Sequence, residues 1–516
     1  MLKNLKNIAV VSLSTVGSRL LGLLRDILIF AALGTSLWNS AFILAFTLPN
    51  LFRRLLGEGA LTSALVPIFS DVLEREGRSG AFRFFNQVLL RLLLALLAIV
   101  SLGMCALHWA AGSEWLPERW VTGAGLAVWL LPYMLFICLA AIISAGLNLL
   151  GRFAVAAATP ILLNLAMIGA LAAGLWLDAE AARVVYWLCG GVLLGGLLQL
   201  VVPAWDLMRQ GWRPRIEGSM GAELAELWHL FLPGLMGAAI LQVNILVSRL
   251  LAYSLDEAAV SVLYLASRLM ELPLGVFTIA VATVFFPLLA KTRSNGDEVE
   301  FSAVFMQGMR LVIGISLPAG VGLIVLGQPI LECLFLWGAF DQADVMATVP
   351  ILAIYGLGLP LYSAATFATR GLHASKDMRT PVRVAGYCLL INLFAGALLM
   401  QFWGAAGLAT GNVLAALAQS ILLWRALSKE RARLSFGAMW AALVQVLLAG
   451  VVMGLVCALA WQVVAQFDLN AKLSAALTVA LCVPGGVAVY FALLFFLRFE
   501  EMGTLLGMLR RYMPKK

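Results

Sequence analysis

The chain has 516 residues, of which 62% are hydrophobic and only 12% are charged, and its mean hydropathy is +0.97. Soluble domains carry about 25% charged residues, so this composition excludes a large soluble domain and predicts a polytopic membrane protein. The net charge of +8 needs no nucleic-acid partner, because a bias of basic residues toward one side of a membrane accounts for it.

Apolar segments long enough to cross a bilayer recur along the whole chain. A spanning helix needs about 20 mostly apolar residues, and on this criterion we predict about fourteen spans. They are expected at residues 7–33, 38–70, 84–110, 123–150, 157–177, 183–205, 224–254, 258–290, 302–327, 345–372, 382–401, 405–427, 436–465 and 473–498. The segment 328–342 is apolar but short, and it is interpreted as a re-entrant or interfacial piece.

Lysine and arginine residues outside these spans gather in alternate loops. If the N-terminus lies inside, the outside loops hold only Arg119, Arg183 and Lys472, and all the others lie in inside loops or in the tail. Cytoplasmic loops of membrane proteins carry this excess of basic residues. We therefore predict a multi-pass membrane protein with both termini in the cytoplasm.

The order of landmarks repeats between two parts of the chain. SRLL occurs at 18–21 and at 248–251, and the span that follows each contains a proline, Pro49 or Pro273. Two six-span blocks that both begin inside predict parallel repeats around a central cleft. We expect an all-α fold with a first lobe at 1–205, a cytoplasmic connector at 206–223, a second lobe at 224–428, and two further spans with a basic tail at 429–516.

Several arginine residues lie inside predicted spans, where a buried guanidinium costs about 3 kcal/mol on insertion scales. Convergent arginines suit a phosphate or pyrophosphate, because each can donate two hydrogen bonds to oxyanions. The adjacent pair at 53 and 54 points in two directions, so at most one of the two faces the centre of the cleft. We predict that substrate is bound by Arg19, Arg25, Arg53, Arg54 and Arg268.

Four other charged residues in the same spans are predicted to balance charge or to gate: Asp26, Glu58, Arg249 and Glu271. Asp26 or Glu58 could neutralise Arg19 within the first lobe. Glu271 follows Arg268 by three positions, which places both side chains on one face of a helix. The alternative role for these carboxylates is ion coupling.

No motif of a catalytic or metal centre is found in the sequence, since it contains no HExxH, Walker or Ser-His-Asp pattern. We therefore expect no catalytic residue, no metal and no cofactor. Energy for any transport would come from the membrane potential, from a monovalent ion or from the supply of substrate.

Longer segments carry a family resemblance. They are SRLLGLLRD (18–26), LPNLFRRLLGEGALTSALVPIF (48–69), GRFAVAAATPILLNLAMI (151–168), SRLMELPLGVF (267–277) and SKDMRTPV (375–382). In this order they resemble the MurJ (MviN) lipid II flippases of the multidrug/oligosaccharidyl-lipid/polysaccharide exporter superfamily. The resemblance implies a transporter, not an enzyme, that moves the undecaprenyl-pyrophosphate-linked peptidoglycan precursor from the cytoplasmic to the periplasmic leaflet by alternating access.

The resemblance further implies a bacterial inner-membrane protein of cell-wall biogenesis and cell shape, whose cavity arginines hold the pyrophosphate and whose last two spans form a groove for the lipid tail. Expected partners are lipid II, membrane lipids and other cell-wall synthesis proteins, and the chain is expected to be a monomer. This chain departs from the family at Ser40 and Ser267, where aspartate is common.

Two alternatives stay open within the superfamily, an exporter of another lipid-linked oligosaccharide of the O-antigen type and a drug exporter. A drug exporter should prefer acidic cavity residues. A membrane enzyme acting on polyprenyl phosphate would need an acid/base or metal cluster that the sequence does not offer.

Overall fold

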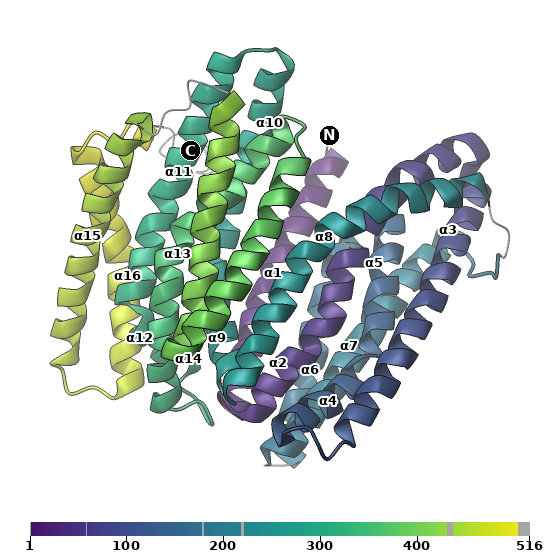
Figure 1. Ribbon diagram of the computed structural model, residues 1–516, viewed down its shortest axis with the longest axis horizontal. Coiled ribbons are helices and arrows are strands. Elements are labelled where there is room, and N and C mark those ends of the chain that lie inside the picture. Colours follow the sequence, from purple (N-terminus) through teal and green to yellow (C-terminus); the bar gives the residue numbers. More distant parts are fainter. Residues whose placement is uncertain (1, 58, 178–179, 218–220, 431–436, 504–516) are drawn as a thin grey trace. The chain divides into compact units, whose positions relative to one another are not determined.

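The computed structural model describes residues 2–57, 59–177, 180–217, 221–430 and 437–503, and every regular element in these ranges is a helix (Figure 1). The first helices are α1 (Leu2–Leu33), α2 (Leu37–Phe52), the π-helix η1 (Arg53–Gly57), α3 (Ala60–Ala111), α4 (Glu118–Leu130), α5 (Tyr133–Leu149), α6 (Phe153–Leu177), α7 (Ala181–Arg209) and α8 (Ala222–Leu255). They are followed by α9 (Ala259–Pro273), the π-helix η2 (Leu274–Thr278), α10 (Ile279–Ser294), α11 (Glu298–Val325), α12 (Gly327–Phe335), α13 (Gln342–Ala374), α14 (Arg379–Glu430), α15 (Gly437–Ala465) and α16 (Ala471–Phe496).

The predicted spans coincide with these helices, which confirms an all-α polytopic fold. In the described ranges, ten helices are long and apolar enough to cross a membrane, or eleven if α4 and α5, which are bent by 43°, form one span. They are fewer than the predicted spans because the spans at 38–70 and 84–110 form one stretch (Leu37–Ala111), the spans at 382–401 and 405–427 share α14, and α1 is not among the ten. Gly77 (φ 69°) and Gly404 (φ 57°) lie between the two joined spans, each in a left-handed conformation that glycine adopts without strain.

The chain forms two compact units. The first comprises residues 1–261 together with the tetrapeptide 337–340, and the second comprises residues 262–336 and 341–516. The lobe boundaries expected at residues 205, 224 and 428 stay a prediction. Each unit is described by itself below.

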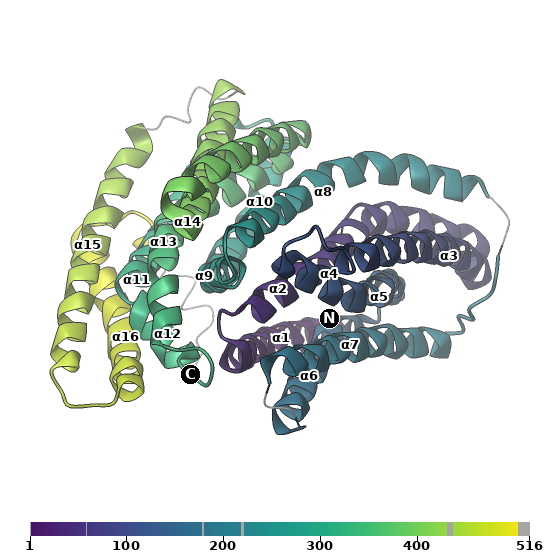
Figure 2. The same cartoon turned by 60° about the horizontal axis from the view of Figure 1, so that its bottom comes forward.

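In the first unit, α6 and α7 run side by side, as Figures 1 and 2 both show, and α1 packs along α6. Glycines on α7 allow this close approach. A side-chain carbon at Gly195 would lie 2.9 Å from the Leu163 Cα, and one at Gly191 would lie 2.6 Å from the Ala170 Cβ. Small residues at helix contacts are the usual means of tight packing in membranes, where apolar lipid removes the hydrophobic driving force between helices.

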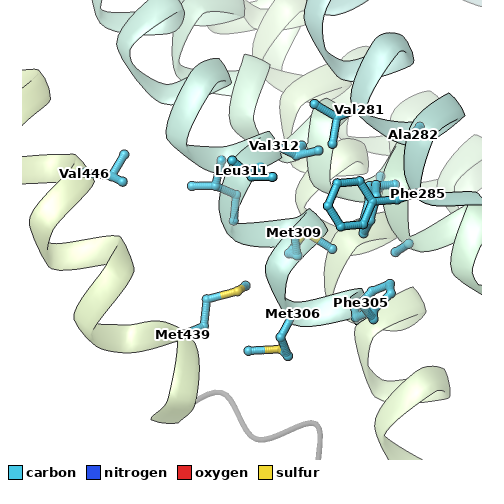
Figure 3. Close-up of a cluster of buried hydrophobic side chains, with 14 of the residues drawn as sticks. Val281, Ala282, Phe285, Phe305, Met306, Met309, Leu311, Val312, Met439 and Val446 are labelled. Atoms are coloured by element: carbon cyan, nitrogen blue, oxygen red, sulfur yellow. The ribbon is translucent and has the colours of Figure 1, made fainter. Parts of the chain in front are cut away.

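The second unit is built around a cluster of buried side chains from α10, α11, α13, α14, α15 and α16. Figure 3 labels members of this cluster from α10, α11 and α15. Phe305 packs on Phe367 with ring centroids 5.4 Å apart, and Phe285 meets Phe367 edge-on at 6.1 Å. The two helices outside the repeat, α15 and α16, form a hairpin that joins this unit, since the Tyr490 hydroxyl donates to the Gly314 carbonyl at 2.6 Å.

The sequence repeat has a structural counterpart in the two π-helical segments. In the first unit η1 begins four residues after Pro49, and in the second unit η2 begins directly after Pro273. Proline lacks a backbone N–H and disturbs the ladder of hydrogen bonds around it, and single π-turns occur often at functional sites. Pro49 and Pro273 therefore lie beside the places where the helical geometry changes.

Helix packing in the second unit predicts the effect of one glycine substitution. A Cβ at Gly320 on α11 would overlap the Gly356 carbonyl oxygen on α13, whereas a Cβ at Gly322, half a turn further along α11, meets nothing within 4 Å. We expect Gly320→Ala to lower the free energy of unfolding by about 1–3 kcal/mol, because overpacking forces the helices apart. Thermal unfolding of the purified protein in detergent measures this, and Gly322→Ala, the matched control, should unfold no earlier than the wild type.

Candidate functional site

The most buried of the predicted arginines is Arg25, on α1, which is 9% exposed. Its Nε and Nη2 both donate to Asp26 Oδ1, at 3.0 and 2.6 Å, and Asp26 is 1% exposed. A charged pair removed from water needs such direct contacts, because burial without them costs several kcal/mol per ion. Asp26 was predicted to balance charge, and its carboxylate is the anionic partner of the Arg25 guanidinium.

The third nitrogen of this guanidinium reaches another helix. Arg25 Nη1 donates to Asn164 Oδ1 of α6 at 3.1 Å, and Asn164 Nδ2 donates in turn to the Ser18 carbonyl at 3.1 Å. Side chains on a helix lean toward its N-terminus, so the long arginine runs back along α1 toward Ser18, two turns earlier. One carboxamide therefore holds both the arginine and the backbone of the helix that carries it.

Asn164 is a site residue that the sequence analysis missed. It lies in the apolar run ILLNLAMI and is 5% exposed. The sequence signal that could have found it is a single polar residue within an apolar span. Such a residue is costly in a membrane and is usually functional or bonded to another helix.

The remaining first-lobe candidates lie on α1 and η1. Arg19 is exposed on α1, nearly two turns before the buried pair, and Arg54 is exposed on η1 while Arg53 is half-buried. The two adjacent arginines therefore differ in burial, as their predicted divergence requires. Glu58, predicted to balance charge, lies outside the described residues.

Arg249, on α8, is fixed to α2 within the first unit. It donates to the Thr47 hydroxyl and, at 3.2 Å, to the Ile43 carbonyl. Both acceptors are neutral, so this contact positions the arginine without cancelling its charge. The two arginines of the SRLL repeat thus differ in their surroundings. Arg249 contacts α2, whereas Arg19 is exposed on α1.

Ser40, where the family often has aspartate, is completely buried in the first unit. Its hydroxyl donates to Ser261 Oγ at 3.2 Å, and the Ser261 N–H lies 3.3 Å from Ser40 Oγ. The Ser261 hydroxyl is also 3.2 Å from the Thr35 carbonyl. A neutral pair of serines therefore ties the beginning of α2 to the beginning of α9.

In the second unit, Arg268 and Glu271 form the pair that their spacing predicted. The Arg268 Nη1 and Glu271 Oε2 atoms are 3.5 Å apart, with 34% and 54% of the side chains exposed. Exposed pairs of this kind contribute little to stability. Ser267, the other departure from the family, donates its hydroxyl to the Tyr264 carbonyl of its own helix at 2.8 Å.

Each unit thus carries arginines on its first helices. Each unit also has a π-helical segment close to a proline, η1 in the first and η2 in the second. The meeting of Arg268 with the arginines of the first unit stays a prediction. Among the described residues, no group of three or more His, Cys, Asp or Glu side chains could hold a metal ion.

This arrangement of long apolar helices in two units defines a polytopic helical membrane protein. An inward-facing multidrug transporter of the multidrug/oligosaccharidyl-lipid/polysaccharide exporter superfamily has the same fold, with a TM-score of 0.66, 15% identity, and coverage of 81% of this chain and 95% of that one. The family model "Lipid II flippase MurJ" matches residues 29–478. The chain belongs to the MurJ lipid II flippase family, which confirms the family resemblance in its sequence.

Named relatives agree with this assignment. A probable lipid II flippase MurJ of Rhizobium meliloti is 36% identical over 82% of this chain and 80% of its own, and one of Haemophilus influenzae is 31% identical over 89% and 92%. A solved structure titled as lipid II flippase MurJ in an inward closed conformation superposes with a TM-score of 0.78 at 26% identity, and covers 95% of this chain and 98% of that one.

The buried pair on α1 predicts a difference between two carboxylates. Asp26→Asn removes the anion beside a buried guanidinium, and we expect it to lower the free energy of unfolding by about 3 kcal/mol. Glu271→Gln, the matched control, removes the carboxylate of an exposed pair and should change it by no more than about 1 kcal/mol. Thermal unfolding of the two purified variants measures both changes. Equal destabilisation would contradict a larger contribution of the buried α1 pair to the free energy of unfolding.

Proposed function

We propose that the protein is a lipid II flippase, which moves the undecaprenyl-pyrophosphate-linked peptidoglycan precursor from the cytoplasmic to the periplasmic leaflet of the bacterial inner membrane. The observation that carries this proposal is the family match over residues 29–478. The protein acts as a transporter and not as an enzyme, and both termini lie in the cytoplasm because inside loops hold nearly all basic residues. It works as a monomer without a cofactor, and lipid II, membrane lipids and other cell-wall synthesis proteins are its partners.

In this proposal, the pyrophosphate is held by Arg19, Arg25, Arg53, Arg54 and Arg268. A guanidinium offers a planar set of donors that matches phosphate oxygens, and it stays charged when water is removed. The exposure of Arg19 and Arg54 and the weak pairing of Arg268 support the proposal, since these side chains can turn toward a ligand.

Arg25 requires an exchange of partners. Its three nitrogens donate to Asp26 and Asn164, so phosphate oxygens would have to replace at least one of these acceptors. The bond to Asn164 is the easier one to give up, because hydrogen bonds between a charged donor and a neutral acceptor lack the charge of the carboxylate. Asn164 thereby keeps Arg25 satisfied in the absence of substrate and releases it when a pyrophosphate arrives.

Movement across the membrane would follow alternating access. The prolines and π-turns of both units support this, because such interruptions let a spanning helix bend. The membrane potential or a monovalent ion would supply energy. The hairpin of α15 and α16 would receive the lipid tail, since these helices carry exposed apolar side chains such as Leu455, Leu459 and Leu481.

Cells that depend on this protein provide the test. Depletion of the wild type should abolish the lipid II that is accessible at the periplasmic face, and re-expression should restore it. Arg25→Ala and Arg268→Ala should each reduce that pool at least tenfold while membrane insertion stays normal, because each removes donors for the pyrophosphate. Arg183→Ala is the matched control, since Arg183 is exposed at the start of α7 and has Glu180 within 3.6 Å.

Undiminished periplasmic lipid II with an intact cell wall after depletion would contradict the flippase assignment. It would favour an exporter of another lipid-linked oligosaccharide. Full complementation by both arginine variants would contradict only their role in binding.

A further inference from the structure

Arginine residues gather where α7 ends and the connector between α7 and α8 begins. The segment 209–217 reads RQGWRPRIE, and the side chains of Arg209, Arg213 and Arg215 are all exposed. Its one acidic residue is Glu217. This end of the first unit therefore presents a net positive charge.

The other acidic residue at this end of α7 is already paired. Asp206 is 5% exposed, and it accepts hydrogen bonds from Arg152 Nε at 3.2 Å and from Arg152 Nη2 at 2.6 Å. Arg152 lies in the turn before α6, so a fourth arginine is brought to the same end of the helix. The buried carboxylate balances that arginine and not the three exposed ones.

The beginning of the connector is folded onto α3. Trp212 is 5% exposed, and its Nε1 donates to Asn86 Oδ1 at 2.8 Å. Asn86 Nδ2 donates in turn to the Arg213 carbonyl at 3.0 Å. The Trp212 ring also meets Phe85 edge-on, with ring centroids 6.1 Å apart. These contacts fix the backbone from which Arg213 and Arg215 extend.

The Arg213 guanidinium lies against the end of α7. Its Nη1 donates to the Met208 carbonyl at 2.9 Å and to the Trp212 carbonyl at 3.2 Å. The carbonyls at the C-terminal end of a helix carry partial negative charge, which attracts a cation. The positive charge is therefore held in a defined place although the residue is exposed.

Arg209 stacks on an aromatic ring of its own helix. Its Cζ lies 3.6 Å from the centre of the Trp205 ring, and Trp205 is 53% exposed. Tryptophan is enriched at the level of the lipid headgroups, because its ring is apolar and its N–H is polar. Stacking uses the flat face of a guanidinium, so the N–H groups on its edge can still bind phosphate oxygens.

We propose that this end of the first unit binds the headgroup phosphate of an anionic phospholipid through Arg209, Arg213 and Arg215. Clusters of basic residues beside a spanning helix recognise anionic lipids in this way. A lipid fits better than a free phosphate, because the arginines are accompanied by exposed apolar side chains, those of Trp205 and Ile216. The inference goes beyond the proposed flippase function and does not depend on it, since it concerns a lipid of the surrounding membrane.

The test measures the lipid affinity of the purified full-length protein in a neutral detergent. Phosphatidylglycerol, which is anionic, and phosphatidylcholine, which is zwitterionic, are titrated separately, and bound lipid is counted by native mass spectrometry. The wild type should bind phosphatidylglycerol more tightly. The double variant Arg209→Gln with Arg215→Gln should bind it at least about tenfold more weakly, because each basic residue near an anionic lipid contributes about fivefold in affinity.

The matched control is the double variant Arg75→Gln with Arg78→Gln. It also removes two exposed arginines, which lie on α3 and are predicted for the same side of the membrane, and it should keep the wild-type affinity. Trp205→Leu retains every charge but removes the ring under Arg209, and it should weaken the binding of phosphatidylglycerol by less than the loss of both arginines.

Equal losses in the two double variants would overturn the proposal, because any exposed arginine would then serve. Equal wild-type affinities for the two lipids, or an unchanged affinity in Trp205→Leu, would overturn it as well. Displacement of phosphatidylglycerol by inorganic phosphate would show a site for a free anion and would also contradict it. None of these results measures lipid II transport, so a failure here is distinguishable from a failure of the flippase function.

Discussion

A guanidinium inside a membrane-spanning helix must have its hydrogen bonds satisfied at every moment, and the first unit is arranged around that requirement. Arg25 is 9% exposed, and its nitrogens donate to Asp26 on its own helix and to Asn164 on α6. A slide of α6 by one turn, about 5.4 Å, would remove Asn164 from both the arginine and the Ser18 carbonyl. The polar contact therefore fixes the register of two helices whose apolar surfaces would tolerate several.

The same contact bears on how tightly Arg25 would bind a substrate in the proposed function. A bare buried cation would bind pyrophosphate tightly but would be too costly to maintain, whereas a cation held only by carboxylates would resist exchange. Arg25 donates to the carboxylate of Asp26 and to neutral atoms of Asn164 and Met167. Arg249 likewise donates to neutral atoms of Thr47 and Ile43. In the proposed function, binding of the pyrophosphate would be an exchange of acceptors at Arg25.

The sequence was sufficient for the membrane class, the spans and the arginine positions, because apolar length and loop charge are properties of the chain itself. Pro49 and Pro273 also marked the places near which the helices become π-helical. By contrast, Asn164 could not be assigned to Arg25, because periodicity does not tell which helix faces α1. The contact of residues 337–340 with the first unit could not be predicted either, because the Ala339 N–H donates to the Ala31 carbonyl and no side-chain pattern encodes such a backbone bond.

The central claim is that Arg25 exchanges the Asn164 carboxamide for a phosphate oxygen. The most direct measurement is the Kd of undecaprenyl pyrophosphate for the purified protein in lipid nanodiscs, with wild type and Asn164→Asp compared. The account predicts at least about tenfold weaker binding by Asn164→Asp, equivalent to about 1.4 kcal/mol, since a second carboxylate would retain the arginine. The double variant Asp26→Asn with Asn164→Asp should recover part of the loss, because it returns the number of carboxylates to one. Equal Kd values for the wild type and Asn164→Asp would contradict the account.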